Sequence, residues 1–238
     1  MIANYIGGSM TNFAMMMNEL ALKIGMKNSK FINAHGLEED GVGNISTAYD
    51  MALLTSYAMK NENYRKITGT KRYTLKTNMN NYIWNNKHKL LNLYEYTTGG
   101  KTGFTQKAGR TLVTTANKEN KNIVVVSFNL PDDFNTHMYL LDKSFKNLIS
   151  KTIISKDTII LDNSNYKLYP KKDYKILLYS KEETSYKYYI DNNNPEKSYI
   201  EIYLNNKLLI KENLGYEKKE WSENKYLFKK LLWGLNLW

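Results

Sequence analysis

The residues best suited to chemistry lie in one short stretch, Thr97–Thr105, which reads Thr-Thr-Gly-Gly-Lys-Thr-Gly-Phe-Thr. Its centre combines Lys101, a compact positive charge, with the hydroxyl of Thr102, which donates a hydrogen bond. Together these groups suit a ligand that ends in a free carboxylate. The glycines leave the backbone bare, so that an extended peptide can pair with the strand edge. The alternative is a glycine-containing turn with an exposed lysine.

The residues that follow this stretch favour a binding site over a turn. Two strand-like runs, residues 111–116 and 123–128, are separated by the polar segment 117–122. This pattern predicts an antiparallel meander that the Lys-Thr-Gly strand opens. A strand edge in that setting is what recognition of an extended peptide requires.

Composition excludes several other kinds of site. The chain of 238 residues has no cysteine and only three histidines, His35, His88 and His137. Thiolate catalysis and Cys-based metal sites are therefore excluded, and we expect no metal and no cofactor. The net charge of +11 favours an anionic partner, which could be nucleic acid, an anionic membrane surface or an acidic wall polymer. Because the lysines are dispersed and no recognition motif accompanies them, we expect no nucleic acid partner.

A helix is predicted near the start of the chain. Ser9 is a candidate N-cap, and apolar residues recur at helical spacing from Phe13 to Ile24. Gly25 is the predicted C-terminal cap. Methionines contribute to this stripe, and we interpret them as core packing.

Other elements are predicted between this helix and residue 150. Ser46 and Thr47 with Asp50 form a capping-box pattern at the start of a second helix. Strand-like pieces occur within residues 64–96, such as residues 71–75 and 82–84, and residues 134–149 read as a helix. The apolar face of that helix consists of Phe134, Met138, Leu141, Phe145 and Leu148.

After residue 151 the composition shifts to Lys, Tyr and Asn with alternating apolar positions, which predicts a small all-β domain. Strands are expected at residues 175–179, 186–190 and 198–204, and Asn205-Asn206 forms a hairpin turn into residues 207–210. The many tyrosines fit either carbohydrate stacking or the filling of a small sheet, and we favour the second interpretation.

The last residues have the composition of an interfacial membrane segment. Residues 226–238 combine Trp, Leu and Phe with Lys229 and Lys230, and the run is too short to span a bilayer. We expect it to bind an anionic membrane surface. A terminal helix docked on the β domain is the alternative.

Four ordered motifs give the chain a resemblance to a known family, the D-alanyl-D-alanine carboxypeptidases, which are low-molecular-weight penicillin-binding proteins of serine peptidase family S11. The motifs are Gly25–Ser29, Asn33–Leu37, Ser46–Ala52 and the Lys-Thr-Gly strand with the strand after it, and Asn86–Leu91 resembles the segment before that strand. The resemblance covers about residues 1–150. Tyr49 stands where the family commonly has Arg, and Ala34 stands where it has Pro.

The resemblance implies an α+β fold, with an incomplete transpeptidase-like domain at residues 1–150, a small β-rich domain at 151–222 and an amphipathic tail at 223–238. It also implies a place on the extracytoplasmic face of the bacterial cell membrane, although the first residues show no signal peptide. The partners would be the peptidoglycan stem peptide ending in D-Ala-D-Ala and, in the full-length family, β-lactams.

The same resemblance implies roles for the residues of the central stretch. Lys101 and Thr102 would hold the terminal carboxylate of the peptide. Gly103 and Thr105 would shape the substrate strand, and Arg110 would add positive potential from the neighbouring turn. His35 is expected to hold its own loop by hydrogen bonds, and no functional role is expected for the other two histidines.

The family's nucleophile motif, Ser-x-x-Lys, and its Ser-x-Asn motif precede Lys-Thr-Gly. Here both patterns occur only after Lys101, at Ser164–Lys167, Ser222–Lys225, Ser127–Asn129 and Ser222–Asn224, and we interpret them as chance. The expectation is a member that lacks its N-terminal part, has no catalytic residue of its own and is inactive alone. The alternatives are a non-catalytic remnant that binds peptidoglycan or membrane, and a chain completed by a separately encoded N-terminal piece.

Overall fold

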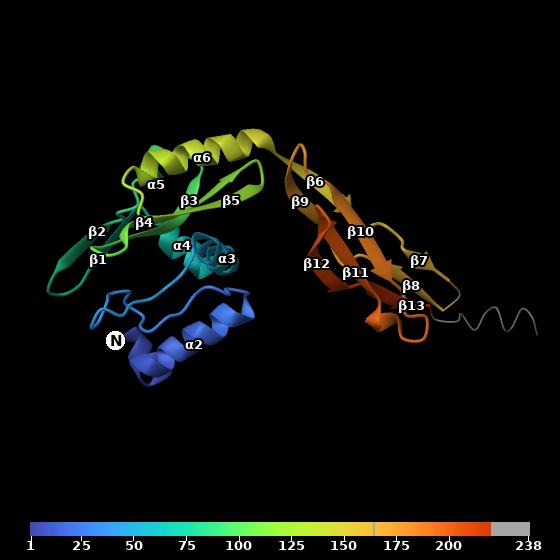
Figure 1. Cartoon of the computed structure of the whole chain (residues 1–238), viewed down its shortest axis with the longest axis horizontal. Helices are drawn as coiled ribbons and strands as arrows, with labels where there is room; N and C mark the ends of the chain where they lie inside the picture. Colours follow the sequence, from blue (N-terminus) through green and yellow to red (C-terminus); the bar gives the residue numbers. More distant parts are fainter. Residues whose placement is uncertain (164, 220–238) are drawn as a thin grey trace, which may run out of the picture. The chain divides into compact units, whose positions relative to one another are not determined.

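The structure is a computed structural model that describes residues 1–163 and 165–219. These residues form two compact units, Met1–Lys146 and a second that begins at Asn147 (Figure 1). Each unit is described by itself. The predicted tail at 226–238 and the serines Ser164 and Ser222 lie outside the described residues.

The helices of the first unit begin where the sequence predicts capping. Ser9 accepts a hydrogen bond from the backbone N–H of Asn12 (3.1 Å), and Thr47 accepts one from that of Asp50 (3.1 Å), which confirms both predicted N-caps. Gly25 follows the first of these helices at φ +89°, a conformation that favours glycine. The helices are α1 (Ile2–Gly7), α2 (Met10–Lys23), α3 (Ala48–Ala58), α4 (Glu62–Gly69), α5 (Leu90–Leu93) and α6 (Asp133–Asn147).

The interpretation of the α2 methionines as core packing is wrong for two of them. Met15 is 53% exposed and Met16 is 46% exposed. The residues of α2 that are buried are Ala14 and Ala21. The small side chains of α2 are therefore the ones that are buried, and Met15 and Met16 extend toward solvent.

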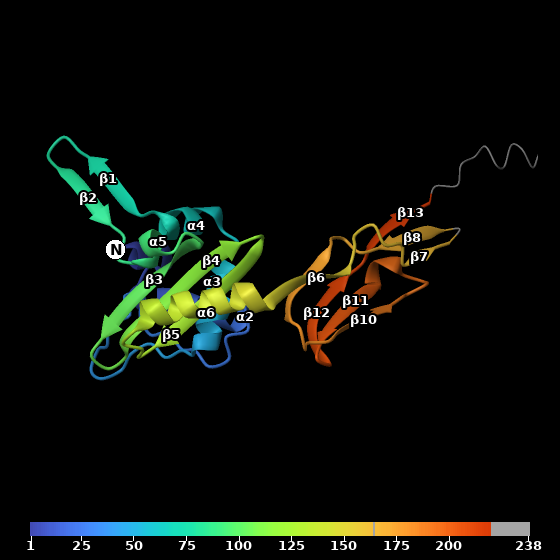
Figure 2. The same cartoon turned by 90° about the horizontal axis from the view of Figure 1, so that it is seen from above.

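A three-stranded antiparallel sheet forms the centre of the first unit. Its strands are β3 (Thr97–Thr105), β4 (Gly109–Lys118) and β5 (Lys121–Phe128), in that order (Figure 2). Glu119 and Asn120 make the tight turn between β4 and β5 with positive φ angles of 51° and 62°. The predicted meander is therefore confirmed, and β3 lies at its edge.

Helices cover both faces of this sheet, with α6 on one face and α3 and α4 on the other (Figure 1). Leu141 and Phe145 of α6 form a core with Ala116 of β4. The predicted apolar face of α6 is confirmed for Leu141 and Phe145 and wrong for Leu148, which belongs to the next strand. His137 is also buried on this helix. The helix ends at Asn147, just before that strand begins.

The hairpin of β1 (Arg72–Lys76) and β2 (Asn81–Asn85) stands apart from this sheet as a two-stranded ribbon. Helices α4 and α5, which flank the hairpin in sequence, both contact β3. The sequence analysis predicted strands in this region but missed the two short helices. Each of them has eight residues or fewer, too short for a clear helical period.

The described residues of the second unit form strands and the 3-10 turn η1 (Pro195–Lys197). The strands are β6 (Leu148–Ile154), β7 (Leu161–Asp162), β8 (Tyr166–Tyr169), β9 (Tyr174–Tyr179), β10 (Thr184–Tyr189), β11 (Tyr199–Leu204), β12 (Lys207–Asn213) and β13 (Gly215–Lys218). They pair antiparallel as β6-β9, β10-β11-β12 and β13-β8-β7. Asn205 and Asn206 have φ angles of 48° and 64°, which confirms the predicted hairpin turn.

The tyrosines of the second unit divide into two groups. Tyr166 and Tyr174 are buried in the core beside Leu168 and Ile200, as the sheet-filling interpretation expects. Tyr186 and Tyr188 of β10 are 44% and 50% exposed, so that interpretation does not account for them.

Taken together, the two units have the α+β architecture that the sequence predicts. Within residues 1–163 and 165–219, none of the helices is both long and apolar enough to cross a membrane.

Candidate functional site

Lys101 lies in the middle of β3, opposite Val113 of β4. Its side chain is exposed, and its ammonium donates a hydrogen bond to the backbone oxygen of Thr102. No aspartate or glutamate among the described residues forms an ion pair with it. The charge of Lys101 is therefore available to an anionic ligand at the surface.

The position of β3 in its sheet leaves one side of the strand open to pairing. It hydrogen-bonds to β4 along Thr97–Thr105 and pairs with no described strand on its other side. An edge strand presents N–H and C=O groups that an added strand can use. Thr102 is half-buried opposite Leu112, one residue beyond the lysine on the same strand. Lys101 and Thr102 are thus consecutive residues of an edge strand, the lysine exposed and the threonine half-buried.

The glycines of β3 have a second role that the sequence analysis missed. A Cβ atom on Gly100 would lie 2.1 Å from the backbone oxygen of Val113 and 2.7 Å from Nε2 of His88. A Cβ atom on Gly103 would lie 2.4 Å from Oγ1 of Thr111. Close packing therefore requires glycine at position 100, whether or not a peptide is bound, while Gly103 leaves room for the hydroxyl of Thr111.

Thr105 ends β3 and fixes the turn that follows. Its Oγ1 accepts a hydrogen bond from the backbone N–H of Ala108 (3.0 Å). The side chain is thereby engaged by its own turn, which shapes the end of the strand.

Arg110 is the second residue of β4, and its guanidinium is paired to a buried carboxylate. Nε and Nη2 donate to the two oxygens of Asp133 at 3.1 Å and 2.7 Å, and the guanidinium lies over the ring of Phe134 at 5.6 Å. Asp133 is 3% exposed. The hydrogen bonds and charge of Asp133 raise the pKa of Arg110. Because this pair is close to neutral, Arg110 adds less positive potential to the site than an unpaired arginine would.

A buried polar chain lies beneath β3 and links His88 to His137. Nε2 of His88 lies 3.0 Å from the backbone oxygen of Val113 and 3.1 Å from Oγ1 of Thr114. The Thr114 hydroxyl lies 2.8 Å from Nδ1 of His137, whose Nε2 lies 2.9 Å from Oγ of Ser127. These hydrogen bonds join β4, β5 and α6, and they stabilise the packing under the site.

Burial lowers the pKa of His137 to about 4, while Asp133 raises it and His88 lowers it further. Burial also lowers the pKa of His88, against the hydrogen bond to Val113. A neutral, fully buried imidazole with so low a pKa is a weak base near neutral pH. The contact between His137 and Ser127 therefore gives no reason to assign Ser127, part of one Ser-x-Asn pattern, as a nucleophile.

Two of the motifs that carry the family resemblance are joined through Asp50, which is 1% exposed. Its carboxylate accepts hydrogen bonds from the backbone N–H of Asn28 (2.8 Å) and from the hydroxyl of Ser29 (2.7 Å). Ser29 in turn contacts Oγ of Ser46 at 2.8 Å. The capping-box carboxylate thus points away from its own helix and fixes the loop after α2.

The Asn33–Leu37 motif also builds a loop. The side chain of Asn33 donates to the backbone oxygen of Leu37 (2.8 Å) and accepts from the N–H of Gly36 (2.9 Å). Nδ1 of His35 accepts from the N–H of Leu37 (3.1 Å), and its Nε2 lies 3.1 Å from Glu39. The prediction that His35 holds its own loop is confirmed.

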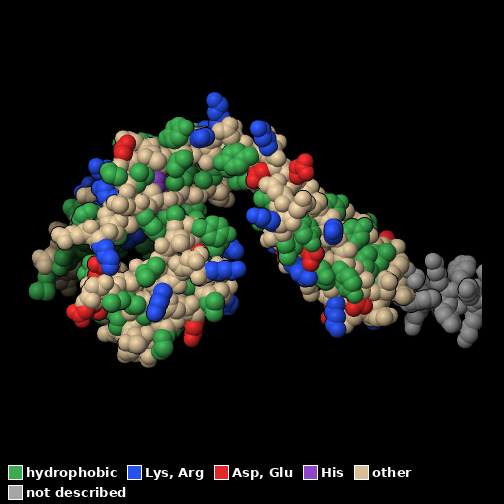
Figure 3. Space-filling model, viewed as in Figure 1, with side chains coloured by type: hydrophobic (Ala, Val, Ile, Leu, Met, Phe, Trp, Pro, Cys, Tyr) green, Lys and Arg blue, Asp and Glu red, His purple; other side chains and the backbone are tan. Residues whose placement is uncertain are grey.

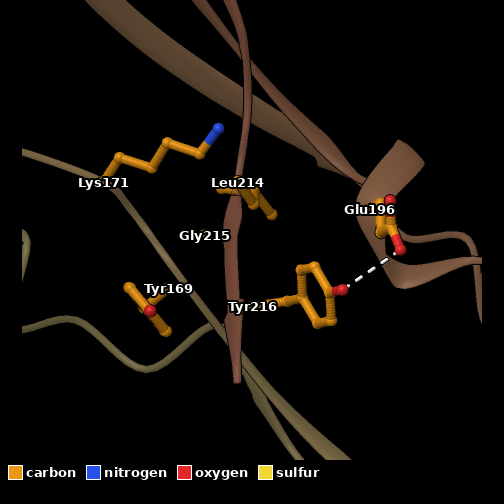
Figure 4. A pocket seen from close by; sticks show the side chains of 6 residues that line it. All are labelled: Tyr169, Lys171, Glu196, Leu214, Gly215 and Tyr216. Carbon is orange, nitrogen blue, oxygen red and sulfur yellow. Dashed lines mark hydrogen bonds between the residues drawn. The ribbon is translucent and has the colours of Figure 1, made fainter. Parts of the chain in front are cut away.

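Two of the hollows that the described residues form lie away from Lys101, which lines neither. One, of about 410 Å³, lies between α3 and the sheet near Thr98 and Thr115. The other, of about 600 Å³, lies in the second unit (Figure 4). There the ring of Tyr216 points toward Glu196 and donates a hydrogen bond to its carboxylate (3.1 Å). The second hollow is lined by Tyr169, Lys171, Glu196, Leu214, Gly215 and Tyr216.

The described part of the chain holds no cluster of three or more His, Cys, Asp or Glu side chains that could bind a metal ion.

Comparison with known proteins gives one family. The sequence profile described as D-alanyl-D-alanine carboxypeptidase, Peptidase S11, matches residues 1–132. D-alanyl-D-alanine carboxypeptidase DacF of Bacillus subtilis is 37% identical over 128 residues, which is 53% of this chain and 32% of that protein. DacC of Escherichia coli, another D-alanyl-D-alanine carboxypeptidase, is 33% identical over 165 residues, which is 66% of this chain and 39% of that protein. This chain thus spans about a third of the length of these relatives.

Among solved structures, penicillin binding protein 5 from Haemophilus influenzae superposes with a TM-score of 0.69 at 24% identity. The superposition covers 92% of this chain and 69% of that one. At this identity the likeness establishes the fold, which agrees with the transpeptidase-like architecture that the sequence motifs imply.

Proposed function

The chain belongs to the D-alanyl-D-alanine carboxypeptidase family, and on that basis we propose that β3 binds peptidoglycan stem peptides that end in D-Ala-D-Ala. The observation that carries the proposal is the exposed ammonium of Lys101 in the middle of an edge strand, without an acidic partner among the described residues. The terminal carboxylate of the peptide pairs with Lys101, and the hydroxyl of Thr102 donates to it.

The other predicted site residues act on the shape of this strand. Gly103 leaves room for the hydroxyl of Thr111 on β4, and Thr105 fixes the turn at the end of β3. Arg110, held by Asp133, positions that turn and contributes a partly neutralised charge. The peptide backbone pairs with the open edge of β3 as an additional strand.

In the family the reaction is acyl transfer to a serine, with release of terminal D-Ala and hydrolysis of the acyl-enzyme by water. In the part of the chain that the structure describes, the hydroxyls of Ser29, Ser127 and Ser155 pair with side chains other than lysine, and both Ser-x-x-Lys patterns follow Lys101 in sequence. We therefore propose that these 238 residues bind the peptide without turning it over. A labelled β-lactam is expected to form no covalent adduct, and an adduct on Ser164 or Ser222 by mass spectrometry would contradict this.

The test of the carboxylate role is a binding titration with a fluorescent acyl-D-Ala-D-Ala peptide. Lys101→Gln should weaken binding by about tenfold or more, the size expected when a charge-assisted hydrogen bond is lost. Lys107→Gln is the matched control, because Lys107 is an exposed lysine in the turn after β3 that pairs instead with Glu38 (3.4 Å). Equal losses in the two variants would show only a general effect of positive charge.

A second function is favoured by the net charge of +11 and by the composition of residues 226–238. The chain would act as a non-catalytic peptidoglycan-binding or membrane-binding protein on the extracytoplasmic face of the bacterial cell membrane. Sedimentation with anionic vesicles should fall when residues 226–238 are removed. Equal sedimentation with and without these residues would contradict the membrane part of this proposal.

A further inference from the structure

The hairpin of β1 and β2 projects from the body of the first unit in both views (Figures 1 and 2), and all ten residues of its strands are exposed. Pairing sets Tyr73 opposite Trp84 and Leu75 opposite Tyr82. Directly opposed residues lie on the same side of a ribbon, so these four side chains share one face. We call this surface, formed by Tyr73, Leu75, Tyr82 and Trp84, the aromatic face. Hydrophobic side chains are visible at the surface of the hairpin in Figure 3.

The rings of the aromatic face are stacked in order. Tyr82 and Trp84 are parallel to within 2°, with ring centroids 5.3 Å apart, and Tyr73 stacks on Trp84 at 6.1 Å and 23°. An isolated two-stranded hairpin is only marginally stable in water, and this stack holds the two strands together. Even so, Tyr73, Tyr82 and Trp84 are 56%, 41% and 50% exposed. The contacts that stabilise the hairpin therefore cover only part of these rings, and the rest of the ring surface is exposed to solvent.

The segment that carries the aromatic face has charges of one sign. Residues 63–94 contain seven Lys or Arg residues and no Asp or Glu. Lys71, Arg72 and Lys76 of the hairpin form no ion pair with any residue that the structure describes. A positively charged surface with exposed rings is complementary to a partner that carries both rings and carboxylates.

The base of the hairpin is fixed close to the proposed substrate strand. The side chain of Asn86 donates to the backbone oxygens of Thr68 (3.3 Å) and Thr70 (3.1 Å), and its N–H donates to the oxygen of Lys71 (2.8 Å). Helix α4 leads into the hairpin and α5 follows it, and both contact β3. The aromatic face is therefore attached at both ends to the elements that support β3.

We propose that the aromatic face binds the glycan strand of peptidoglycan while its stem peptide lies on β3. This inference rests on the proposed function, because it adds a second contact for the same substrate. The C–H groups on one side of a pyranose ring pack on an aromatic ring, and amide side chains can hydrogen-bond its hydroxyl and acetamido groups. Five residues of strand extend about 17 Å, the length of about three linked sugar rings. The carboxylates of the stem peptides match the surrounding Lys and Arg side chains.

The tip of the hairpin argues against a membrane as the partner. Residues 77–81 read Thr-Asn-Met-Asn-Asn, so three of the five carry amide side chains. Burying such groups in hydrocarbon without hydrogen bonds is costly. The apolar surface lies along the flank of the hairpin, where a flat polymer can pack, and Met79 is the one apolar residue of the tip.

The test uses the full chain and N-acetylglucosamine oligomers, which have no peptide and no charge. Replacing Trp221, Trp233 and Trp238 by Phe leaves Trp84 as the single tryptophan, since the chain has four. Its fluorescence should change in intensity and saturate as the oligomer is added. In co-sedimentation with purified peptidoglycan sacculi, Tyr82→Ser with Trp84→Ser should lower the bound fraction by about tenfold. Trp84→Phe should restore most of the binding, because it retains an aromatic ring.

Two controls separate the contact from loss of folding and from loss of the peptide site. Tyr186→Ser with Tyr188→Ser removes two exposed strand tyrosines of the second unit and should leave sacculus binding unchanged. Lys101→Gln should leave oligomer binding unchanged, so failure of the peptide proposal and failure of this one are distinguishable. Sacculus binding retained by the serine variant, or a Trp84 signal that responds only to phosphatidylglycerol vesicles, would overturn the proposal. If the serine variant loses its hairpin by circular dichroism, the response of Trp84 in the folded single-tryptophan chain decides.

Discussion

Acid should destabilise the first unit through His137, before most carboxylates are protonated. The imidazole is 0% exposed, and its pKa is about 4 in the folded protein against about 6.5 in an unfolded chain. Between these values the unfolded chain binds a proton that the folded protein does not. The free energy of unfolding therefore falls as the pH falls from about 6.5 to about 4, and above pH 6.5 this group has no effect.

The magnitude follows from the same two pKa values. Each pKa unit of difference corresponds to about 1.4 kcal/mol, so the full effect below pH 4 is about 3 kcal/mol. Between pH 7 and pH 5 the loss is about 2 kcal/mol, since at pH 5 the unfolded imidazole is almost fully protonated and the folded one is almost fully neutral. A mesophilic domain with a typical stability of about 5–15 kcal/mol would show this clearly.

Hydrogen exchange is the suitable assay, because it reports on the first unit separately. The amides of residues 112–116 in β4 should lose about 2 kcal/mol of protection from pH 7 to pH 5, after correction for the intrinsic exchange rate. His137→Gln should remove most of this pH dependence. His35→Gln is the control, since His35 has a side chain that is 36% exposed. An unchanged pH dependence in His137→Gln would refute the reasoning.

Three further predictions concern the support of the site. Asp50→Ala removes a buried carboxylate that accepts two part-buried hydrogen bonds and should lower the free energy of unfolding by about 2 kcal/mol in urea titrations. Gly100→Ala places a Cβ atom 2.1 Å from the backbone oxygen of Val113 and should cost more than about 2 kcal/mol, or prevent folding, as seen by circular dichroism. Asp133→Ala removes the buried carboxylate that pairs with Arg110. The melting temperature should fall, because the half-exposed guanidinium loses its hydrogen bonds and charge partner.

Local rules predicted much of the fold from the sequence. The caps at Ser9 and Thr47 depend only on side chains within three residues, and the turn at Asn205-Asn206 depends on two residues that tolerate positive φ. The β4–β5 meander follows from alternating apolar runs with a polar turn between them. Each of these features is decided by neighbours in sequence, so the sequence is sufficient to find it.

What the sequence could not show depends on contacts between distant residues. Asp50 was assigned to a capping box, yet its carboxylate bonds to Ser29, 21 residues earlier. Arg110 was expected to supply free charge, yet Asp133 pairs with it from 23 residues away. His137 was given no role, because nothing in its own segment shows that it is buried against Thr114. Tertiary packing sets each of these environments.

The aromatic residues of the β1–β2 hairpin show that exposure, like burial, depends on tertiary packing. Strand propensity correctly places Tyr82 and Trp84 in strands, but propensity does not show whether a strand is covered. Only the structure shows that their ribbon pairs with no other strand of the described chain and remains exposed.

The central claim is that the ammonium of Lys101 on β3 recognises the terminal carboxylate of a wall peptide. Calorimetric titration of the full chain with an acyl-D-Ala-D-Ala peptide, and with the same peptide amidated at its C-terminus, tests this most directly. The account predicts that amidation weakens binding by about tenfold or more in the wild type and has no further effect in Lys101→Gln. Equal affinity of the wild type for the acid and the amide would contradict the account.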